Sequence, residues 1–199
     1  MSVVIAIKDE NKIWFACDSQ SSCGQTKKTL TNPNNYKIMK PKKEKDTLLG
    51  VVGALKFCNV LHIQEEFINE LTKLKDEFNF EYVVKTLIPK IFSIAKTYGC
   101  SEKQENQDIY VLDGSILFAY KDNLFKIDNY GCCTEIDDFV VVGSGSSLAL
   151  GYLNQHNKND SKSEIIIKAV KSACESNLYV NYPIIVMNNK DDEVLIIEK

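Results

Sequence analysis

The residue of this sequence that most suggests chemistry is Ser2, which directly follows the initiator methionine. If Met1 is removed, Ser2 carries both a hydroxyl group and a free α-amine that can accept the hydroxyl proton. A serine hydroxyl is a weak nucleophile until a base takes its proton. The α-amine, whose ordinary pKa is about 8, is a base within the same residue. The sequence therefore offers a candidate for nucleophilic catalysis at its own amino terminus.

Four more residues with suitable chemistry follow at intervals along the chain. They are a carboxylate, an amine, a glycine before a helical segment and a serine between two glycines, namely Asp18, Lys37, Gly53 and Ser144. A glycine N–H can donate to a developing oxyanion, and a serine can orient an amine or a water molecule. Each residue also has a structural interpretation. Asp18 can be a turn former and Lys37 an exposed strand residue, while Gly53 can begin a helix and Ser144 can be a small residue in a turn. Ser2 likewise has one, as a small residue that permits removal of methionine.

The composition is typical of one globular domain, which we expect to cover residues 1–199. Hydrophobic residues make up 44% of the chain and charged residues 26%. A domain of this size buries about 70% of the surface that its unfolded chain exposes, so it needs no disulfide or metal to fold. The net charge of -3 gives no electrostatic reason to expect nucleic acid as a partner.

The cysteines and the apolar runs suggest where the protein resides. The seven cysteines are odd in number and show no C-x-x-C spacing, which is typical of a reduced cytoplasmic protein. The apolar run Val3 to Ile7 is too short for a signal peptide, and charged residues follow it at once. No apolar run approaches the roughly 20 residues of a membrane span. We therefore expect a soluble protein with no leader and no membrane segment.

Short strands and longer helices must position the candidate residues. Apolar and β-branched runs between turn residues predict strands over 3–8, 12–17, 36–39, 47–52, 109–112, 115–121, 124–127, 139–142, 184–187 and 194–197. Apolar residues at helical spacing predict helices over 54–74, 81–98, 148–153 and 161–177. The last helix begins at a capping box, Ser161 to Glu164, and the polar residues 19–35 predict a loop. This order predicts two sheets covered by helices on both outer faces.

Taken in order, these motifs resemble those of the proteasome β-subunit and bacterial HslV peptidase family, which are N-terminal nucleophile hydrolases. The resemblance covers nearly the whole chain and rests on Ala16-Cys17-Asp18-Ser19 after a hairpin, Lys37-Ile38, Gly53 before a helix, and Gly143-Ser144-Gly145 before another helix. HslV is the more similar, because the chain is short and residues 177–181 are similar to an HslV segment. The resemblance implies an α+β fold, a four-layer αββα sandwich of two antiparallel sheets flanked by helix pairs.

The resemblance also implies a role for each candidate residue. Ser2 matches the family's catalytic threonine, because the interval from Ser2 to Asp18 is the one the family uses. Asp18 then matches the buried aspartate, Lys37 the active-site lysine, Gly53 the oxyanion-hole glycine and Ser144 the serine near the terminal amine. Lys37, a cation held by Asp18, would keep the pKa of the amine low enough for it to be neutral near pH 7. The Gly53 N–H would contribute on the order of 3 kcal/mol to oxyanion stabilisation.

Two departures from the family pattern affect the nucleophile and the lysine. Serine replaces threonine as the nucleophile, so the methyl group that restricts χ1 is missing. The interval from Asp18 to Lys37 is longer than the family's by about three residues, an insertion most easily placed at Asn32 to Asn35. Lys40 and Lys28 are therefore alternatives for the active-site lysine.

The implied function is that of an ATP-dependent-protease-type peptidase core subunit. It would assemble as a homo-oligomeric ring, cleave unfolded polypeptide through Ser2 after removal of Met1, and receive its substrate from an unfoldase ATPase. Peptide-bond hydrolysis requires no cofactor, although backbone carbonyls around Cys174, Asn177 and Val180 match a monovalent-cation loop of HslV. Two alternatives stay open: a catalytically inactive structural or binding homologue that retains Met1, and an amidase of the wider class that acts on a small amide.

Overall fold

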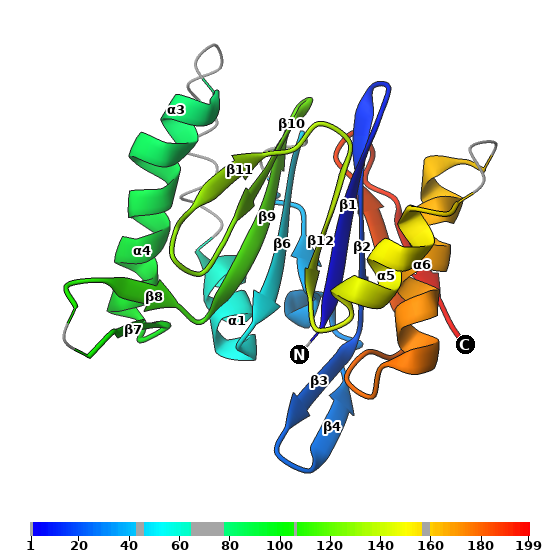
Figure 1. Cartoon of the computed structure of the whole chain (residues 1–199), viewed down its shortest axis with the longest axis horizontal. Coiled ribbons are helices and arrows are strands. Elements are labelled where there is room, and N and C mark those ends of the chain that lie inside the picture. Colours follow the sequence, from blue (N-terminus) through cyan, green and yellow to red (C-terminus); the bar gives the residue numbers. More distant parts are fainter. Residues whose placement is uncertain (1, 43–45, 65–77, 106, 157–159) are drawn as a thin grey trace.

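The chain folds as four layers. The computed structural model describes residues 2–42, 46–64, 78–105, 107–156 and 160–199. Two five-stranded sheets lie face to face, and helices cover the outer face of each sheet (Figure 1). This arrangement is the α+β, four-layer αββα sandwich of antiparallel sheets, so the expected fold is confirmed.

The first sheet carries the amino terminus. Its strand order is β12-β1-β2-β13-β14, and every neighbouring pair is antiparallel. The strands are β1 (Val3–Asp9), β2 (Lys12–Asp18), β12 (Phe139–Gly143), β13 (Ile184–Asn188) and β14 (Val194–Ile197). Val3 lies opposite Gly143, and Val4 lies opposite Cys17. The start of β1 therefore lies between the ends of β12 and β2.

The second sheet faces the first and has the order β11-β10-β9-β6-β5. Its strands are β5 (Ile38–Met39), β6 (Thr47–Gly53), β9 (Gly114–Tyr120), β10 (Asn123–Ile127) and β11 (Cys133–Glu135). Its pairs are also antiparallel, with Gly53 opposite Gly114. Two small hairpins lie outside these sheets, formed by β3 (Gln20–Cys23) with β4 (Thr26–Thr29) and by β7 (Ser101–Lys103) with β8 (Tyr110–Leu112).

The helices form two groups, one on each outer face (Figure 1). They are the 3-10 turn η1 (Pro33–Asn35), α1 (Leu55–Ile63), α3 (Phe80–Tyr82), the π-helical η2 (Val83–Leu87), α4 (Ile88–Thr97), α5 (Ser146–Leu153) and α6 (Lys162–Ser176). The capping box of α6 is confirmed, because the side chains of Ser161 and Glu164 each bond the other's backbone N–H. None of the described helices is long and apolar enough to cross a membrane.

Several predicted elements need correction. Residues 19–35 were expected to form a loop, but most of them form the β3–β4 hairpin, which turns at Gly24 with a positive φ of 56°. The short strands β7 and β11 were also missed. The helix predicted over 54–74 is α1, which ends at Ile63, and residues 65–74 lie outside the described part of the chain. The helix predicted over 81–98 is divided by a π turn that ends just before Pro89, whose ring and missing N–H disfavour a continuous helix.

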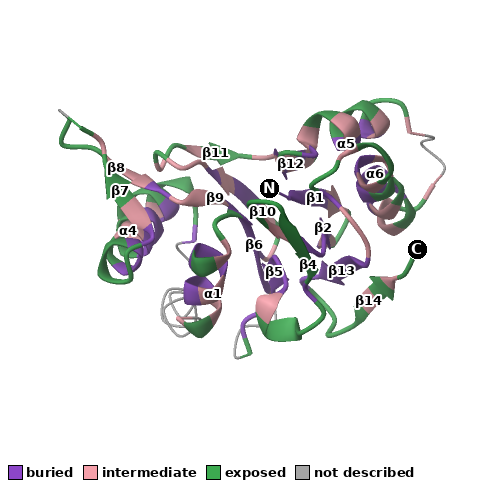
Figure 2. Cartoon of the chain, turned by 90° about the horizontal axis from the view of Figure 1, so that it is seen from below, coloured by how far each residue is buried: buried purple, intermediate pink, exposed green. Residues whose placement is uncertain are grey.

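Three clusters of apolar side chains hold the four structural layers together. Figure 2 shows that most of the strands between them are buried. Successive side chains of β1 point to opposite faces of its sheet. Val3 and Ile5 pack against α5 and α6, whereas Val4 and Ala6 pack between the sheets with residues such as Phe15. A third cluster fills the space between the second sheet and the helices α1 and α4. The strand that follows Ser2 is therefore buried on both faces and rigidly placed.

Candidate active site

Ser2 is held at the end of the first sheet by the turn between β12 and α5. Its backbone nitrogen donates to Ser144 Oγ at 3.1 Å, and its carbonyl oxygen accepts from the Gly145 N–H at 3.2 Å. Gly143 has φ of 103°, and a Cβ there would lie 2.2 Å from the Ser2 carbonyl oxygen. Only glycine permits this approach, so the Gly143-Ser144-Gly145 segment is required both as a turn and as a contact to Ser2.

Asp18 is fully buried and receives a hydrogen bond from several directions. Its Oδ1 accepts from the Val3 N–H at 2.9 Å and from Lys37 Nζ at 2.6 Å. Its Oδ2 accepts from the Gln20 N–H at 3.0 Å and from the Asn181 N–H at 3.4 Å. Lys37 Nζ also donates to the Gln20 carbonyl at 2.7 Å. A buried charge is tolerated only when it is paired and hydrogen bonded, as this carboxylate is.

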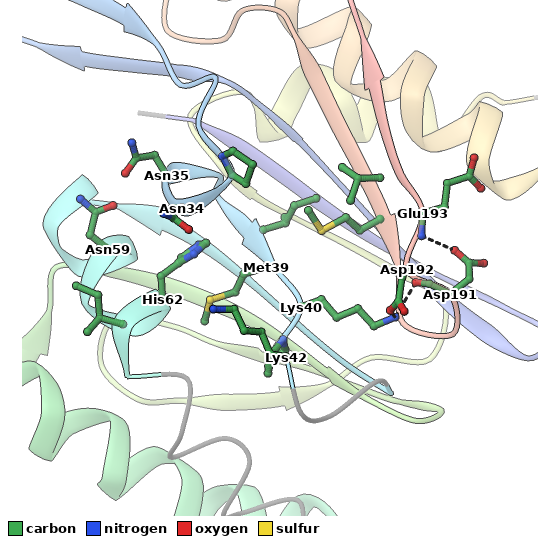
Figure 3. A pocket seen from close by; sticks show the side chains of 16 residues that line it. Asn34, Asn35, Met39, Lys40, Lys42, Asn59, His62, Asp191, Asp192 and Glu193 are labelled. Atoms are coloured by element: carbon green, nitrogen blue, oxygen red, sulfur yellow. Dashed lines mark hydrogen bonds and ion pairs between the residues drawn. The ribbon is translucent and has the colours of Figure 1, made fainter.

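The structure separates Lys37 from the two alternative lysines. Lys40 Nζ donates to the Asp191 carbonyl at 2.6 Å and lies 3.2 Å from Asp192 Oδ1. Figure 3 shows this contact at the edge of a hollow of about 800 Å³ that does not include Ser2. Lys28 lies on the exposed strand β4. Lys37 is therefore the one of the three lysines that contacts Asp18.

Gly53 ends β6 in a conformation that favours glycine, with φ of 128°. A Cβ at this position would lie 2.1 Å from the Asp113 carbonyl oxygen and 2.5 Å from Gly114 Cα. The same Asp113 carbonyl accepts from the Ala54 N–H at 2.9 Å, which fixes the path of the chain into α1. Gly53 can therefore both lead the chain into α1 and act beside Ser2, so its structural and functional interpretations are compatible.

Two hollows meet at Ser2, and Gly53 lines both of them. The first, of about 290 Å³, we call the Lys37 hollow; it is lined by Ser2, Gln20, Ser21, Ser22, Cys23, Leu30, Lys37, Val51, Gly53, Ala54, Leu55 and Cys58. The second, of about 420 Å³, we call the Asp113 hollow; it is lined by Ser2, Val52, Gly53, Leu112, Asp113, Gly114, Ser115, Asn129, Gly143 and Ser144. A substrate that crosses Ser2 can therefore occupy space on either side of it. The structure brings the five predicted site residues together around these hollows and the Asp18 pair.

Two residues that connect the site to the loop after α6 were missed by sequence reasoning. Gln20 is buried, and its Nε2 donates to the Leu178 carbonyl at 2.9 Å. Asn177, considered only as part of a cation loop, donates from Nδ2 to the Ser144 carbonyl at 2.9 Å. Gln20 lies two positions after Asp18, and this spacing is the one signal in the sequence that it shares a face with the aspartate. No such signal connects Asn177 to Ser144.

Two buried thiols lie near the ion pair. Burial raises the pKa of Cys17 and of Cys58 from 9.0 to about 12, and the positive charge of Lys37 opposes this only in part. Cys58 Sγ also donates to the Tyr36 carbonyl at 3.3 Å. Because the thiolate is the nucleophilic form of cysteine, neither thiol is an effective nucleophile near neutral pH. These two cysteines are therefore not candidates for the nucleophile.

The expected monovalent-cation loop begins at Cys174 in the last turn of α6 and continues to Val180, before β13. The Asn177 carbonyl accepts from the Val180 N–H at 3.2 Å, so it is already part of a turn. The described residues contain no cluster of three or more histidine, cysteine or acidic side chains that could hold a metal. Carbonyl oxygens are nevertheless suitable ligands for a hard cation, and a cation at this loop stays a prediction.

Comparisons with known proteins agree with this fold. A family model described as "Proteasome subunit" matches residues 2–187. A comparison with curated proteins finds no match. Among solved structures, Thiobacillus denitrificans BPH in complex with epoxomicin is 18% identical, with a TM-score of 0.65 over 99% of this chain and 100% of that one.

Two further structures have the same fold. An Anbu (Gly-1) mutant from Hyphomicrobium sp. strain MC1 is 16% identical, with a TM-score of 0.73 over 100% of this chain and 87% of that one. A eukaryotic HslV from Trypanosoma brucei is 15% identical, with a TM-score of 0.64 over 94% of this chain and 98% of that one. At these identities the likeness establishes the fold.

Proposed function

This chain belongs to the proteasome subunit family, and on that basis we propose that it is a peptidase subunit whose nucleophile is the Ser2 hydroxyl, activated by removal of Met1. The observation that carries the proposal is the 3.1 Å hydrogen bond between the Ser2 nitrogen and Ser144 Oγ, at a residue that lines two adjoining hollows. While Met1 is present, that nitrogen is an amide and cannot act as a base. Once Met1 is removed, the nitrogen is an amine in the same position.

The proposed acylation step uses groups that lie at Ser2. The α-amine takes the proton of Ser2 Oγ, directly or through a water molecule, and Oγ attacks the carbonyl carbon of the scissile peptide bond. The resulting ammonium group then gives its proton to the leaving nitrogen as the C–N bond breaks. This produces an ester on Ser2 and a free amine. A water molecule, deprotonated by the same α-amine, attacks the ester and restores the hydroxyl group.

The buried ion pair supports this chemistry electrostatically. The Lys37 ammonium lines the same hollow as Ser2 and is held by Asp18 Oδ1 and the Gln20 carbonyl. A fixed positive charge disfavours protonation of a nearby amine, so it favours the neutral base. Because the backbone N–H of Val3 also donates to Asp18, the carboxylate connects the position of the lysine to the residue that follows the nucleophile.

Gly53 and Ser144 would complete the site. We assign to the Gly53 N–H the role of donor to the oxyanion that forms on the substrate carbonyl, because Gly53 lines both hollows beside Ser2. Ser144 would orient the amine, since its Oγ lies 3.1 Å from the Ser2 nitrogen and 3.4 Å from the Ser2 carbonyl oxygen. Asn177 holds Ser144 in turn through the Ser144 carbonyl.

We also propose that the subunit assembles with copies of itself into a ring and cleaves unfolded polypeptide delivered by an unfoldase ATPase. Family membership supports assembly, and so do large apolar side chains left exposed in the single chain, such as Leu178 at 86% and Ile63 at 75%. Sedimentation velocity should give a species several times heavier than the 22.5 kDa chain. A purely monomeric protein would contradict the assembly proposal.

The decisive experiment for Ser2 is an intact-mass measurement with and without an epoxyketone such as epoxomicin. An epoxyketone needs both the hydroxyl and the free amine of one residue to form its morpholine adduct. For the unaltered protein we expect the mass of the chain without Met1 and one adduct per chain. Ser2→Ala should form no adduct. The control Ser93→Ala, which changes an exposed serine on α4, should form the adduct normally. Retention of Met1 without any adduct would instead favour the catalytically inactive homologue.

A further inference from the structure

The two hollows that meet at Ser2 differ in their chemistry. The Lys37 hollow contains the apolar side chains of Leu30, Val51 and Leu55. The Asp113 hollow contains the polar residues Asp113 and Asn129 and several small residues. Among the described residues that line the Asp113 hollow, Asp113 is the only charged one. A peptide that spans Ser2 therefore meets a different environment on each side of its scissile bond.

The position of Ser144 shows which hollow faces the leaving group. In the proposed reaction the Ser2 amine returns its proton to the nitrogen that leaves, so the leaving group must lie on the side of the amine. The Ser2 nitrogen is hydrogen bonded to Ser144 Oγ. Ser144 lines the Asp113 hollow but not the Lys37 hollow. The residue that follows the scissile bond accordingly enters the Asp113 hollow.

Hydrogen bonds hold the backbone of Asp113 in place, and its carboxylate can bind a cation. Its N–H donates to the Cys100 carbonyl at 3.0 Å, and its carbonyl accepts from the Ala54 N–H at 2.9 Å, so its backbone is fixed from both sides. Within the described part of the chain, no cationic nitrogen lies within 4.0 Å of its carboxylate. Lys56, whose positive charge opposes the effect of Asp113 on the pKa of the Cys100 thiol, donates to the Gly99 carbonyl instead.

We propose that Asp113 is a specificity-determining residue that selects peptide bonds followed by a lysine or an arginine; this inference rests on the function proposed for Ser2. The carboxylate accepts a hydrogen bond from the substrate cation, and the polar side chain of Asn129 lines the same hollow. Asp113 is half-buried, so the pair is partly exposed to solvent and contributes a modest preference that salt weakens.

Two internally quenched peptides test this inference. They are identical except that the residue after the scissile bond is arginine in one and citrulline, its uncharged isostere, in the other. We expect kcat/KM for the arginine peptide to be about three- to fivefold higher at low ionic strength. The ratio should be smaller in 0.5 M salt, where the Debye length is shorter. The ratio does not depend on the fraction of active enzyme, so partial removal of Met1 does not affect it.

Variants then assign the preference to a residue. Asp113→Asn should reduce the ratio to about one, whereas Asp113→Glu, which keeps the charge, should retain part of it. Asp122→Asn is the matched control, because Asp122 is an exposed carboxylate in the turn between β9 and β10, at the far end of β9 from Asp113. Formation of the epoxyketone adduct by Asp113→Asn shows that the variant is folded.

The outcomes separate this inference from the function on which it rests. Cleavage of both peptides at equal rates, or an unchanged ratio in Asp113→Asn, overturns the specificity role and leaves Ser2 as the nucleophile. Failure to cleave either peptide, together with failure to form the adduct, overturns the proposed function and this inference with it.

Discussion

Replacement of Lys37 by methionine tests the importance of the buried ion pair. The lysine side chain is 6% exposed and that of Asp18 is 0% exposed. The substitution removes the 2.6 Å contact with Asp18 and the 2.7 Å hydrogen bond to the Gln20 carbonyl, while methionine fills a similar volume. Removal of one partner of a buried pair costs about 3–5 kcal/mol, because an uncompensated charge remains. Asp18 keeps its backbone N–H donors, so we expect a loss at the lower end, about 3 kcal/mol.

The assay is urea unfolding at pH 7, followed by the fluorescence of Trp14, the single tryptophan, which lies on β2. Subunit concentration must be the same for every variant, because assembly adds to the apparent stability. Lys40→Met is the matched control: its partner Asp192 is 73% exposed, so the loss should stay below about 1 kcal/mol. Peptidase activity should be lost with Lys37→Met and retained with Lys40→Met. Equal losses of stability, or an active Lys37→Met variant, would refute the reasoning.

Two other predictions concern backbone space and pH. Gly53→Ala should lower the free energy of unfolding by about 3 kcal/mol or more in the same assay, because the new Cβ would lie 2.1 Å from the Asp113 carbonyl oxygen. Gly24→Ala is the control: Gly24 is also at positive φ, but its Cβ would have no heavy atom within 4 Å, so the loss should be only about 1 kcal/mol. Comparable losses in the two variants would argue against the clash. Burial raises the pKa of Cys17 and Cys58 to about 12. Above pH 9 the folded state therefore keeps thiol protons that the unfolded state releases. The free energy of unfolding then falls by about 1.4 kcal/mol per pH unit for each thiol. Unfolding free energies from pH 8 to 11 should decline less steeply in Cys58→Ala than in the unaltered protein, and identical slopes would contradict the shift.

The layers of the fold were predictable because their signal is local. Alternating or continuous apolar runs defined the strands of both sheets except β11, and helical spacing together with the capping box at Ser161 defined the helices. The β3–β4 hairpin was missed because its residues are polar and largely exposed, and a strand without a buried face has no apolar pattern. The π turn before Pro89 lies within 81–98, where helical spacing predicted a single helix.

The candidate site was less accessible to local reasoning. The sequence favoured Lys37 but left Lys28 and Lys40 as alternatives, since the choice depends on which lysine contacts Asp18 in the folded chain. Asp113 was not among the candidate site residues, because its contact with Gly53 depends on the pairing of β6 with β9. Such contacts between distant segments leave no periodic signal along the chain.

The hydrogen bonds around Ser2 also determine when, during synthesis, this site can exist. Ser2 and Ser144 are 142 positions apart, and Asp18 and Asn181 are 163 positions apart. The ribosome makes the chain from its amino terminus, so β1 and β2 emerge long before β12 and β13, their partners in the sheet. Contacts of such separation form late, after the loops between them close. A nascent chain therefore carries Ser2 without the groups that would align it, and the cell meets an aligned nucleophile only after nearly the whole chain has been translated.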